Sequence, residues 1–432
     1  MLNKIIGKSG PVLVVVLTLI PIMLWVPYAN FSNSSRWWLS LGQVTAIAGF
    51  VLYCLNFVLS ARLKIIEPFF AGINRAYIWH HLFGATALIL LLYHPLLISV
   101  SYLAISLQAA AALLWPSLKN LPIYFGSLAL IITIVLLFLT LYVKLEYDFW
   151  KKTHQYLGAA LFLACLHVFL IGSTVAENPT LKFYLLTLAT LAICSFLYRT
   201  LLGRWLVKRK DYIVAKHTKI DKDVLDLELE PVSGKAIPFI AGQFIFVQPD
   251  ARGIAKQYHP FSLTSKEGSV NLSIGIKAVG DFTETLKLLE PGAKVKVEGP
   301  FGRFSYHFYP NPRQVWIAGG IGVTPFVGLA KSLPKENFEV DFYYAVKDEK
   351  EAVYKEVFEA TAKENPRFKF HLHCSKDKGR LSADIIAKDI NELAKAEIFV
   401  CGPPPMMKSM KEQMVKLKVP KMNMHSEEFA LN

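Results

Sequence analysis

The sequence predicts a membrane protein with three parts: a bundle of six transmembrane helices, an antiparallel β-barrel and a doubly wound α/β domain. Hydrophobic residues make up 53% of the 432 residues, and the excess lies before about residue 205. After it, runs with a period of two residues, such as VLDLELE, predict barrel strands. From about residue 313, short apolar strands alternate with amphipathic segments, which indicates an α/β domain. We therefore expect domains at 1–205, 206–310 and 311–432.

The membrane part is predicted from the length of its apolar runs. A helix rises about 1.5 Å per residue, so a bilayer needs about 20 apolar residues. The first of the six runs could instead be a signal peptide, because Lys4 and Lys8 precede it. The segment 104–120 is also apolar, as a segment lying along the membrane surface would be. The predicted spans are 11–28, 39–60, 77–101, 121–143, 152–172 and 181–202.

The net charge of +14 reflects membrane topology, so the sequence gives no reason to expect a nucleic-acid partner. Residues 1–205 contain 13 Lys or Arg against four Asp or Glu. With the N-terminus inside, ten of these basic residues fall on the inner side and three on the outer side, as the positive-inside rule requires. This predicts a multi-pass protein of the plasma membrane whose N-terminus and C-terminal half are cytoplasmic. The five cysteines build neither a disulfide framework nor a Cys-x-x-Cys site.

Five histidines lie in the third and fifth predicted spans: His81 and two spaced pairs, His80 with His94 and His154 with His167. Ionisable side chains are costly in a bilayer, so such residues usually have a function. Neutral imidazole is a ligand of haem iron, and an interhelical hydrogen bond is the alternative. The members of each pair lie about 20 Å apart along a helix, one near each leaflet. These histidines are therefore the candidate metal ligands for two stacked haems.

His81 competes with its neighbour His80 for the ligand role. At about 100° per residue, His80 returns to within about 40° of the face of His94, whereas His81 misses it by about 140°. The angle favours His80. His154 and His167 are also about 140° apart, so helix tilt and rotamer choice would have to bring them to one face.

These segments resemble the ferric-reductase-type transmembrane domain that NADPH oxidases and ferric reductases share. The similarity is carried by HHLFG at 80–84, by HP at 94–95, and by YDFW at 147–150, which leads to His154 and His167. The resemblance implies two b-type haems, an inner one held by His80 with His154 and an outer one held by His94 with His167.

Two fragments of the predicted barrel resemble the FAD-binding signature of NADPH oxidases, namely HPFSLTS at 259–265 and IKAVGDFT at 276–283. Hydroxyl groups of Ser262 and Thr264 can bond a flavin edge, and Phe261 or Phe282 can stack on a ring. A cation and the backbone amides that open a short helix suit a pyrophosphate. Related reductases have Arg where His259 stands, so Lys277 would supply the charge. The candidate FAD-binding residues are His259, Pro260, Phe261, Ser262, Thr264, Lys277, Gly280, Phe282 and Thr283.

Two glycine-containing turns of the α/β domain suit a nicotinamide nucleotide. In AGGIGVTP at 318–325, glycines let the backbone approach phosphates and Pro325 suits a first helical position, although a simple strand–helix turn has the same pattern. CGPP at 401–404 ends the strand that borders the nicotinamide in the similar family, and a buried structural Cys is the alternative. The candidates are Gly320, Gly322, Thr324, Pro325, Cys401, Gly402 and Pro403.

Three further residues follow the third α/β strand, where related reductases hold the 2′-phosphate of NADPH: Ser375, Lys376 and Arg380. They favour NADPH over NADH, although a solvated basic loop has the same composition. Near the C-terminus, SEEF at 426–429 resembles the family's ending, in which Phe429 would cover the flavin or pack in the core. The candidate catalytic residues are Ser262, Cys401 and Phe429.

The resemblance covers nearly the whole chain and implies a minimal bacterial-type member, without a calcium-binding extension. Such a protein passes electrons from cytoplasmic NADPH (or NADH) through FAD and two haems to an external acceptor. Oxygen, giving superoxide, is the favoured acceptor, since no further His or carboxylate cluster suggests an iron-binding site. A ferric chelate, a quinone or a partner protein are the alternatives. A non-enzymatic haem sensor would leave the flavin and nucleotide motifs unused.

Overall fold

The computed structural model describes residues 2–115, 117–143 and 145–427. The chain divides into two compact units. We call residues 8–70 and 75–207 the helical unit, and residues 1–7, 71–74 and 208–432 the sheet unit.

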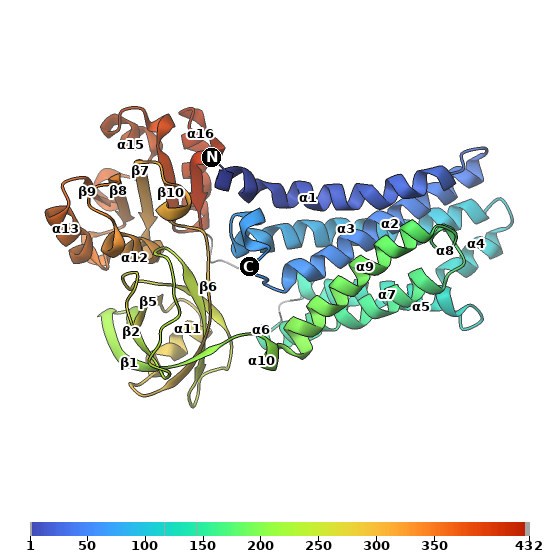
Figure 1. Ribbon diagram of the computed structural model, residues 1–432, viewed down its shortest axis with the longest axis horizontal. Helices are drawn as coiled ribbons and strands as arrows, with labels where there is room; N and C mark the ends of the chain where they lie inside the picture. Colours follow the sequence, from blue (N-terminus) through green and yellow to red (C-terminus); the bar gives the residue numbers. More distant parts are fainter. Residues whose placement is uncertain (1, 116, 144, 428–432) are drawn as a thin grey trace. The chain divides into compact units, whose positions relative to one another are not determined.

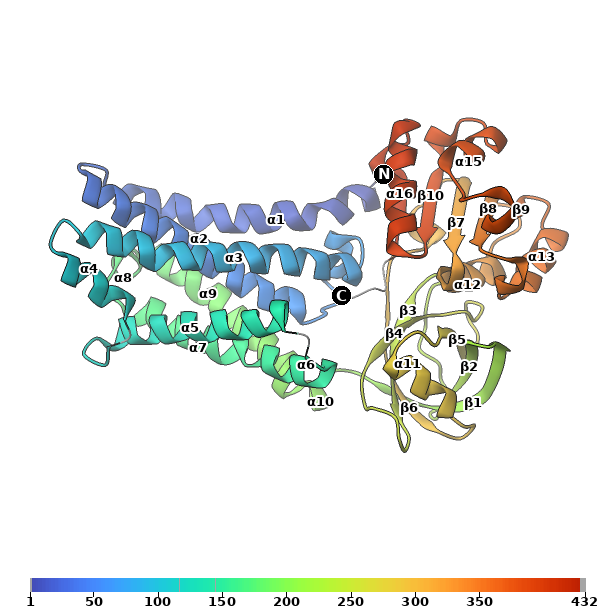
Figure 2. The ribbon, with the colours of Figure 1, turned by 180° about the vertical axis from the view of Figure 1, so that it is seen from behind.

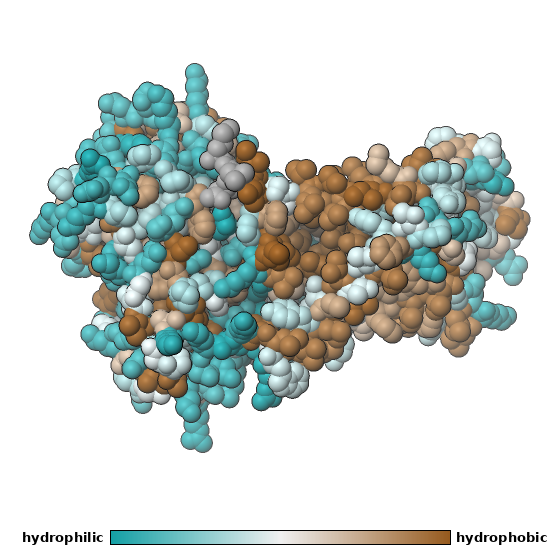
Figure 3. All heavy atoms as spheres, in the orientation of Figure 1, coloured by the Kyte–Doolittle hydropathy of each residue, from teal (hydrophilic) through white to brown (hydrophobic). Residues whose placement is uncertain are grey.

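The helical unit belongs to a multi-pass membrane protein. Six helices within the described residues are long and apolar enough to cross a membrane, and Figures 1 and 2 show them running side by side. Large apolar side chains such as Phe183, 73% exposed, lie on their outside, and Figure 3 shows hydrophobic residues over most of the unit's visible surface. The helices are α1 (Leu2–Trp25), α2 (Ser34–Ser60), α3 (Ile73–Tyr102), α5 (Leu121–Tyr142), α6 (Tyr147–Gln155) with α7 (Leu157–Leu170), and α9 (Pro179–Phe196).

Asparagine caps set the start of three of these helices. The side chains of Asn33, Asn120 and Asn178 each accept a hydrogen bond from the backbone N–H three residues on, at the start of α2, α5 and α9. Such caps satisfy backbone donors that a helix start leaves unpaired. The apolar segment 104–120 contains a short helix, α4 (Leu107–Leu114), and two further short helices follow in the unit, α8 (Thr174–Glu177) and α10 (Gly203–Leu206).

The fifth span is interrupted, where the sequence predicts one continuous helix over 152–172. Helix α6 ends at Gln155 and α7 begins at Leu157. The N–H of Tyr156 bonds to the carbonyl of Thr153, and the N–H of Ala159 to the carbonyl of Tyr156, which is the i to i+3 spacing of a 3₁₀ turn. A 3₁₀ helix turns about 120° per residue instead of about 100°. This turn rotates His167 relative to His154 and reduces the angular mismatch that the sequence indicates.

The first part of the sheet unit is the predicted antiparallel barrel. Its six strands have the order β4-β3-β6-β1-β2-β5, and a bridge between Leu263 and Ile274 joins the chain after β4 to β5, which closes the sheet. Apolar side chains such as Leu227, Ile245 and Val297 fill the interior. The strands are β1 (Lys210–Asp221), β2 (Val224–Pro231), β3 (Phe244–Asp250), β4 (His259–Ser262), β5 (Leu272–Lys277) and β6 (Lys294–Phe301), and a short helix, α11 (Asp281–Thr285), follows β5.

The second part is a five-stranded parallel sheet with the order β11-β10-β7-β8-β9. The strand order reverses at β7, so the gap between the carboxyl ends of β7 and β10 is the switch point where doubly wound folds bind ligands. The strands are β7 (Arg313–Gly319), β8 (Glu339–Val346), β9 (Phe368–Cys374), β10 (Glu397–Cys401) and β11 (Met424–Ser426).

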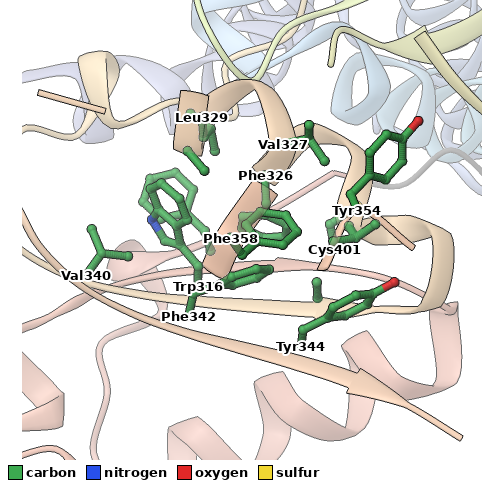
Figure 4. Close-up of a cluster of buried hydrophobic side chains, with 14 of the residues drawn as sticks. Trp316, Phe326, Val327, Leu329, Val340, Phe342, Tyr344, Tyr354, Phe358 and Cys401 are labelled. Atoms are coloured by element: carbon green, nitrogen blue, oxygen red, sulfur yellow. The ribbon is translucent and has the colours of Figure 1, made fainter. Parts of the chain in front are cut away.

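Helices cover both faces of this sheet. On one face, α12 (Thr324–Ser332) and α13 (Lys355–Glu364) pack their aromatic side chains against Trp316 and Phe342, as Figure 4 shows. On the other face, α15 (Ala383–Asp389) and α16 (Pro404–Lys416) pack against Val315 and Ile398. Helix α14 (Ser375–Lys378) follows β9.

Candidate functional site

The four predicted haem ligands form two facing pairs inside the helical unit. The ring centres of His80 and His154 are 6.4 Å apart, and those of His94 and His167 are 6.2 Å apart. A metal–imidazole bond is about 2 Å long and the ring centre lies about 1.2 Å behind the nitrogen, so two imidazoles on one metal have centres about 6.4 Å apart. Each pair therefore has the spacing that one haem iron between two imidazoles requires.

The hydrogen bonds of these rings also suit metal binding. In three rings Nδ1 lies within hydrogen-bond distance of a backbone carbonyl: 3.2 Å from Asn56 O for His80, 2.9 Å from Gly42 O for His94, and 2.8 Å from Pro122 O for His167. A carbonyl can only accept, so each ring carries its proton on Nδ1. This leaves the lone pair of Nε2 for a metal, the arrangement found in metal-binding histidines.

In the fourth ring, that of His154, a hydroxyl group takes the place of the backbone carbonyl. Its Nδ1 lies 3.3 Å from Thr140 Oγ1. The Thr140 hydroxyl proton is already donated to the carbonyl of Leu136, 2.8 Å away. The hydroxyl oxygen therefore accepts from Nδ1 of His154, and Nε2 is again left with its lone pair.

The structure distinguishes His80 from His81. His81 is exposed on α3, and its ring makes no hydrogen bond within the described part of the chain. His80 has both a facing imidazole and a carbonyl acceptor for its Nδ1 proton. These surroundings suit a metal ligand, and the choice of His80 over His81 stays a prediction.

Sequence reasoning missed the groups that orient these rings. Backbone carbonyls of α2 and α5 have no residue-type signal, so no motif could reveal them. Gly126 on α5 is a further case: a Cβ there would lie 2.7 Å from Nδ1 of His167. Its only signal is one glycine in an apolar run.

The candidate FAD residues surround β4 and the start of α11. Ser262 is 3% exposed, and its hydroxyl has no hydrogen-bond partner among the described residues. A buried hydroxyl without a partner is unfavourable, so it fits an acceptor or donor on a flavin ring. The ring of His259 stacks on Phe282 at 3.7 Å between centres. Lys277 is exposed at the end of β5, where its ammonium can reach a phosphate.

The structure gives other partners to several groups that the sequence assigns to FAD. The Thr264 side chain is fully buried, and its hydroxyl points to Asp226 Oδ2, 3.5 Å away. The Gly280 N–H bonds to Thr283 Oγ1 at 3.1 Å, so it closes the turn before α11 and is not open to a pyrophosphate. Phe261 packs against the barrel core, while Pro260 holds β4 opposite Phe246.

The nucleotide-binding candidates meet at the switch point of the parallel sheet. Gly320 has a positive φ of +53°, and a Cβ there would meet nothing within 4 Å, so this turn has open space beside it. Gly322 serves packing, because a Cβ there would lie 2.5 Å from Cys401 O and 2.6 Å from the Cα of Gly402. Thr324 and Pro325 begin α12, and Pro403 immediately precedes α16.

Cys401 ends β10 and is 2% exposed, with its Sγ 3.6 Å from the carbonyl of Glu427. Both the catalytic role and the structural role predicted for it are compatible with this position. Phe429 lies outside the described residues.

At the carboxyl end of β9, Ser375 begins α14 and Arg380 is exposed. Lys376 Nζ lies 3.4 Å from Asp348 Oδ2. The backbone N–H of Lys350 and the Lys376 ammonium hold the pKa of Asp348 below its ordinary value. The predicted basic loop therefore lies beside a carboxylate from the segment after β8, which sequence reasoning missed.

Three family models match the chain. Residues 45–165 match the "Ferric reductase like transmembrane component", residues 211–306 the "Oxidoreductase FAD-binding domain", and residues 316–412 the "Oxidoreductase NAD-binding domain". The two C-terminal matches coincide with the barrel and the parallel sheet.

Individual relatives and solved structures match different shares of the chain. NADH-cytochrome b5 reductase 1 of Cryptococcus neoformans var. neoformans serotype D is 28% identical over 44% of this chain and 72% of that protein. NADH-cytochrome b5 reductase 1 of Kluyveromyces lactis is 30% identical over 43% of this chain and 72% of that protein. The crystal structure of flavohemoglobin from Malassezia yamatoensis, with bound FAD and heme, has a TM-score of 0.49 and 24% identity, over 78% of this chain and 94% of that one.

The fold and the matched domains define a multi-pass membrane oxidoreductase that uses FAD and a nicotinamide nucleotide. The chain has the ferric-reductase/NADPH-oxidase-type architecture, in which a ferric-reductase-like transmembrane component precedes the FAD- and NAD-binding domains.

Proposed function

We propose that this chain carries electrons across the plasma membrane, from cytoplasmic NADPH through FAD and two b-type haems to oxygen, producing superoxide. The observation that carries the proposal is that the helical unit holds two facing pairs of imidazole rings, whose ring centres are 6.4 and 6.2 Å apart. Two sites at different depths of one bundle suit a relay across a bilayer. In such a relay, FAD takes two electrons from the nucleotide as a hydride and gives them up singly to the haems.

The chain's own residues would bind and orient these groups. His80 with His154, and His94 with His167, would hold the two irons through Nε2, because Nδ1 is engaged in all four rings. Ser262 would bond the flavin, and the open turn at Gly320 would admit the nucleotide phosphates. Cys401, at the end of the neighbouring strand, would border the nicotinamide, and Phe429 would cover the flavin.

The preference for NADPH over NADH rests on charge. Lys376 and Arg380 are exposed cations at the carboxyl end of β9. Cations at this position can form charge-assisted hydrogen bonds with a 2′-phosphate. We also propose domain boundaries at 1–205, 206–310 and 311–432, and a cytoplasmic N-terminus and C-terminal half.

The full-length protein, purified in detergent with FAD, tests the proposal. The pyridine haemochrome assay should report about two b-type haems per chain. NADPH oxidation should accompany a dye reduction that superoxide dismutase suppresses. One haem per chain after haem-replete expression would refute the relay. Dye reduction insensitive to the dismutase, with rapid reduction of a ferric chelate, would replace oxygen by the chelate as the acceptor.

A further inference from the structure

One hydroxyl group connects the barrel to the parallel-sheet domain, within the sheet unit. Tyr354, just before α13, donates a hydrogen bond of 2.7 Å to Asp226 Oδ2 on β2. Gly275 lies opposite Asp226 on β5, and a Cβ there would come within 2.5 Å of the Tyr354 hydroxyl and 2.7 Å of Thr324 Cγ2. Since Thr324 begins α12 after the glycine-rich turn, Tyr354 and the start of α12 lie against the same spot on the barrel.

Helix α12 makes a second set of contacts, with the chain that follows Ser262. A Cβ on Gly328 would lie 2.6 Å from the carbonyl oxygen of Leu263, so the helix backbone touches this segment directly. The Lys331 ammonium donates to the carbonyl of Thr264 at 3.0 Å. The Thr264 hydroxyl in turn points to Asp226. The nucleotide turn and the flavin segment are therefore tied to each other and to the Tyr354–Asp226 bond.

The backbone of Tyr354 indicates that its side chain is held in place. Its φ of 63° and ψ of 14° are left-handed values that are uncommon for a large residue. Such conformations persist where the surrounding structure enforces them, often at functional sites. Figure 4 shows Tyr354 at the margin of the buried hydrophobic cluster, with its hydroxyl pointing away from it.

We propose that Tyr354 is a positioning residue that, through Asp226, sets the nucleotide turn against the flavin segment. The proposal rests on the function proposed above, in which a hydride, two electrons with one proton, leaves the nicotinamide and joins the flavin. Tyr354 contributes no atom to that step. It affects the distance between the hydride donor and the hydride acceptor. Reaction rates are sensitive to this distance, and a displacement of about 1 Å can lower the rate about 100-fold.

The test is anaerobic stopped-flow reduction of the flavin by saturating NADPH, in the full-length protein in detergent. Tyr354→Phe should slow flavin reduction about tenfold or more, while the FAD content and the nucleotide concentration for half-maximal rate stay within twofold of wild type. Asp226→Asn keeps an oxygen that accepts the Tyr354 bond, so its rate should stay within about threefold of wild type.

Tyr343→Phe is the matched control. Tyr343 also donates to a carboxylate, Asp389 Oδ2 at 3.0 Å, but this bond lies inside the parallel-sheet domain. Its loss should leave flavin reduction within twofold of wild type. Hydrogen exchange gives a readout that needs no turnover: Tyr354→Phe should raise amide exchange in residues 260–267 and 320–332, and Tyr343→Phe should not.

Normal rates in Tyr354→Phe, or equal slowing in both Phe variants, would overturn the proposal. So would slowing by Asp226→Asn equal to that of Tyr354→Phe, because the hydroxyl bond would then not be the cause. If neither NADPH nor NADH reduces the wild-type flavin, the proposed function itself fails. The exchange comparison then still decides whether Tyr354 holds the two segments together.

Discussion

Gly126→Ala should remove the outer haem and leave the inner one. Gly126 on α5 faces the ring of His167, whose Nδ1 is held by the carbonyl of Pro122. A Cβ at position 126 would lie 2.7 Å from Nδ1 and 2.8 Å from Cγ of that ring. The substitution therefore acts on a proposed iron ligand without changing the ligand itself.

The size of the effect follows from the contact distances. Ordinary van der Waals contact for a Cβ begins at 3.4 Å, so relaxing the 2.7 Å approach to ordinary contact requires the ring to move by about 0.7 Å. In a well-formed metal site the metal–ligand distances lie within about ±0.2 Å of their standard values. If α5 moves instead, the overpacking costs about 1–3 kcal/mol. Either response favours loss of the ligand, and we expect about one haem per chain.

Haem content by the pyridine haemochrome assay, together with a redox titration, measures this prediction. Gly172→Ala is the matched control, because a Cβ there would meet nothing within 4 Å. It should retain about two haems. Two haems with wild-type potentials in Gly126→Ala would refute the assignment of His167 as a ligand. Loss of both haems, with a lowered melting temperature, would mean that the helical unit has been disrupted as a whole.

Three further predictions concern other parts of the chain. His80→Ala should lower the haem content to about one per chain, whereas His81→Ala should retain both haems; the haemochrome assay separates the two. Replacing Lys376 and Arg380 by Ala should raise the KM for NADPH at least about tenfold and leave the KM for NADH unchanged, because each charge-assisted bond lost is worth about 1.5–3 kcal/mol. An equal rise in KM for both nucleotides in steady-state assays would show that this loop does not bind the 2′-phosphate. Burial raises the pKa of Asp226 by more than the hydrogen bonds from Tyr354 and Thr264 lower it. The ionised carboxylate therefore lowers the free energy of unfolding once the pH rises above its unfolded pKa of about 3.9. Asp226→Asn should therefore raise the melting temperature at pH 7, and this gain should vanish as the pH falls to about 4.

The architecture was predictable because each of its parts leaves a periodic signal. Long apolar runs indicated the spans, and the alternation of strands and helices indicated the parallel sheet. The ends of elements were less predictable. The fifth span breaks at Tyr156, where the only residue-type signal is Gly158 two positions later, and one glycine in an apolar run does not predict a turn of 3₁₀ spacing.

The sequence signal for the candidate site is strongest where side chains carry the chemistry, as at His80 and Ser262, and those assignments stay predictions. The signal is weaker where one side chain can serve two partners. The hydroxyl of Thr264 suits a flavin edge by type and position, but it points to Asp226, a residue 38 positions earlier on another strand. Spacing along one strand cannot show which neighbour a buried hydroxyl will find.

The least predictable groups are those that act through the backbone. Three of the four histidines are oriented by carbonyl oxygens, which every residue has, so only the path of α2 and α5 past the rings makes Asn56, Gly42 and Pro122 matter. Two glycines depend on the fold in the same way, because Gly126 and Gly275 matter only through the neighbouring side chains that a Cβ there would contact too closely. A ring held by a backbone carbonyl tolerates substitution of the residue that supplies the carbonyl, provided the helix keeps its course. Tolerance at Asn56 combined with intolerance at Gly126 would therefore be the mark of ligands positioned by helix packing.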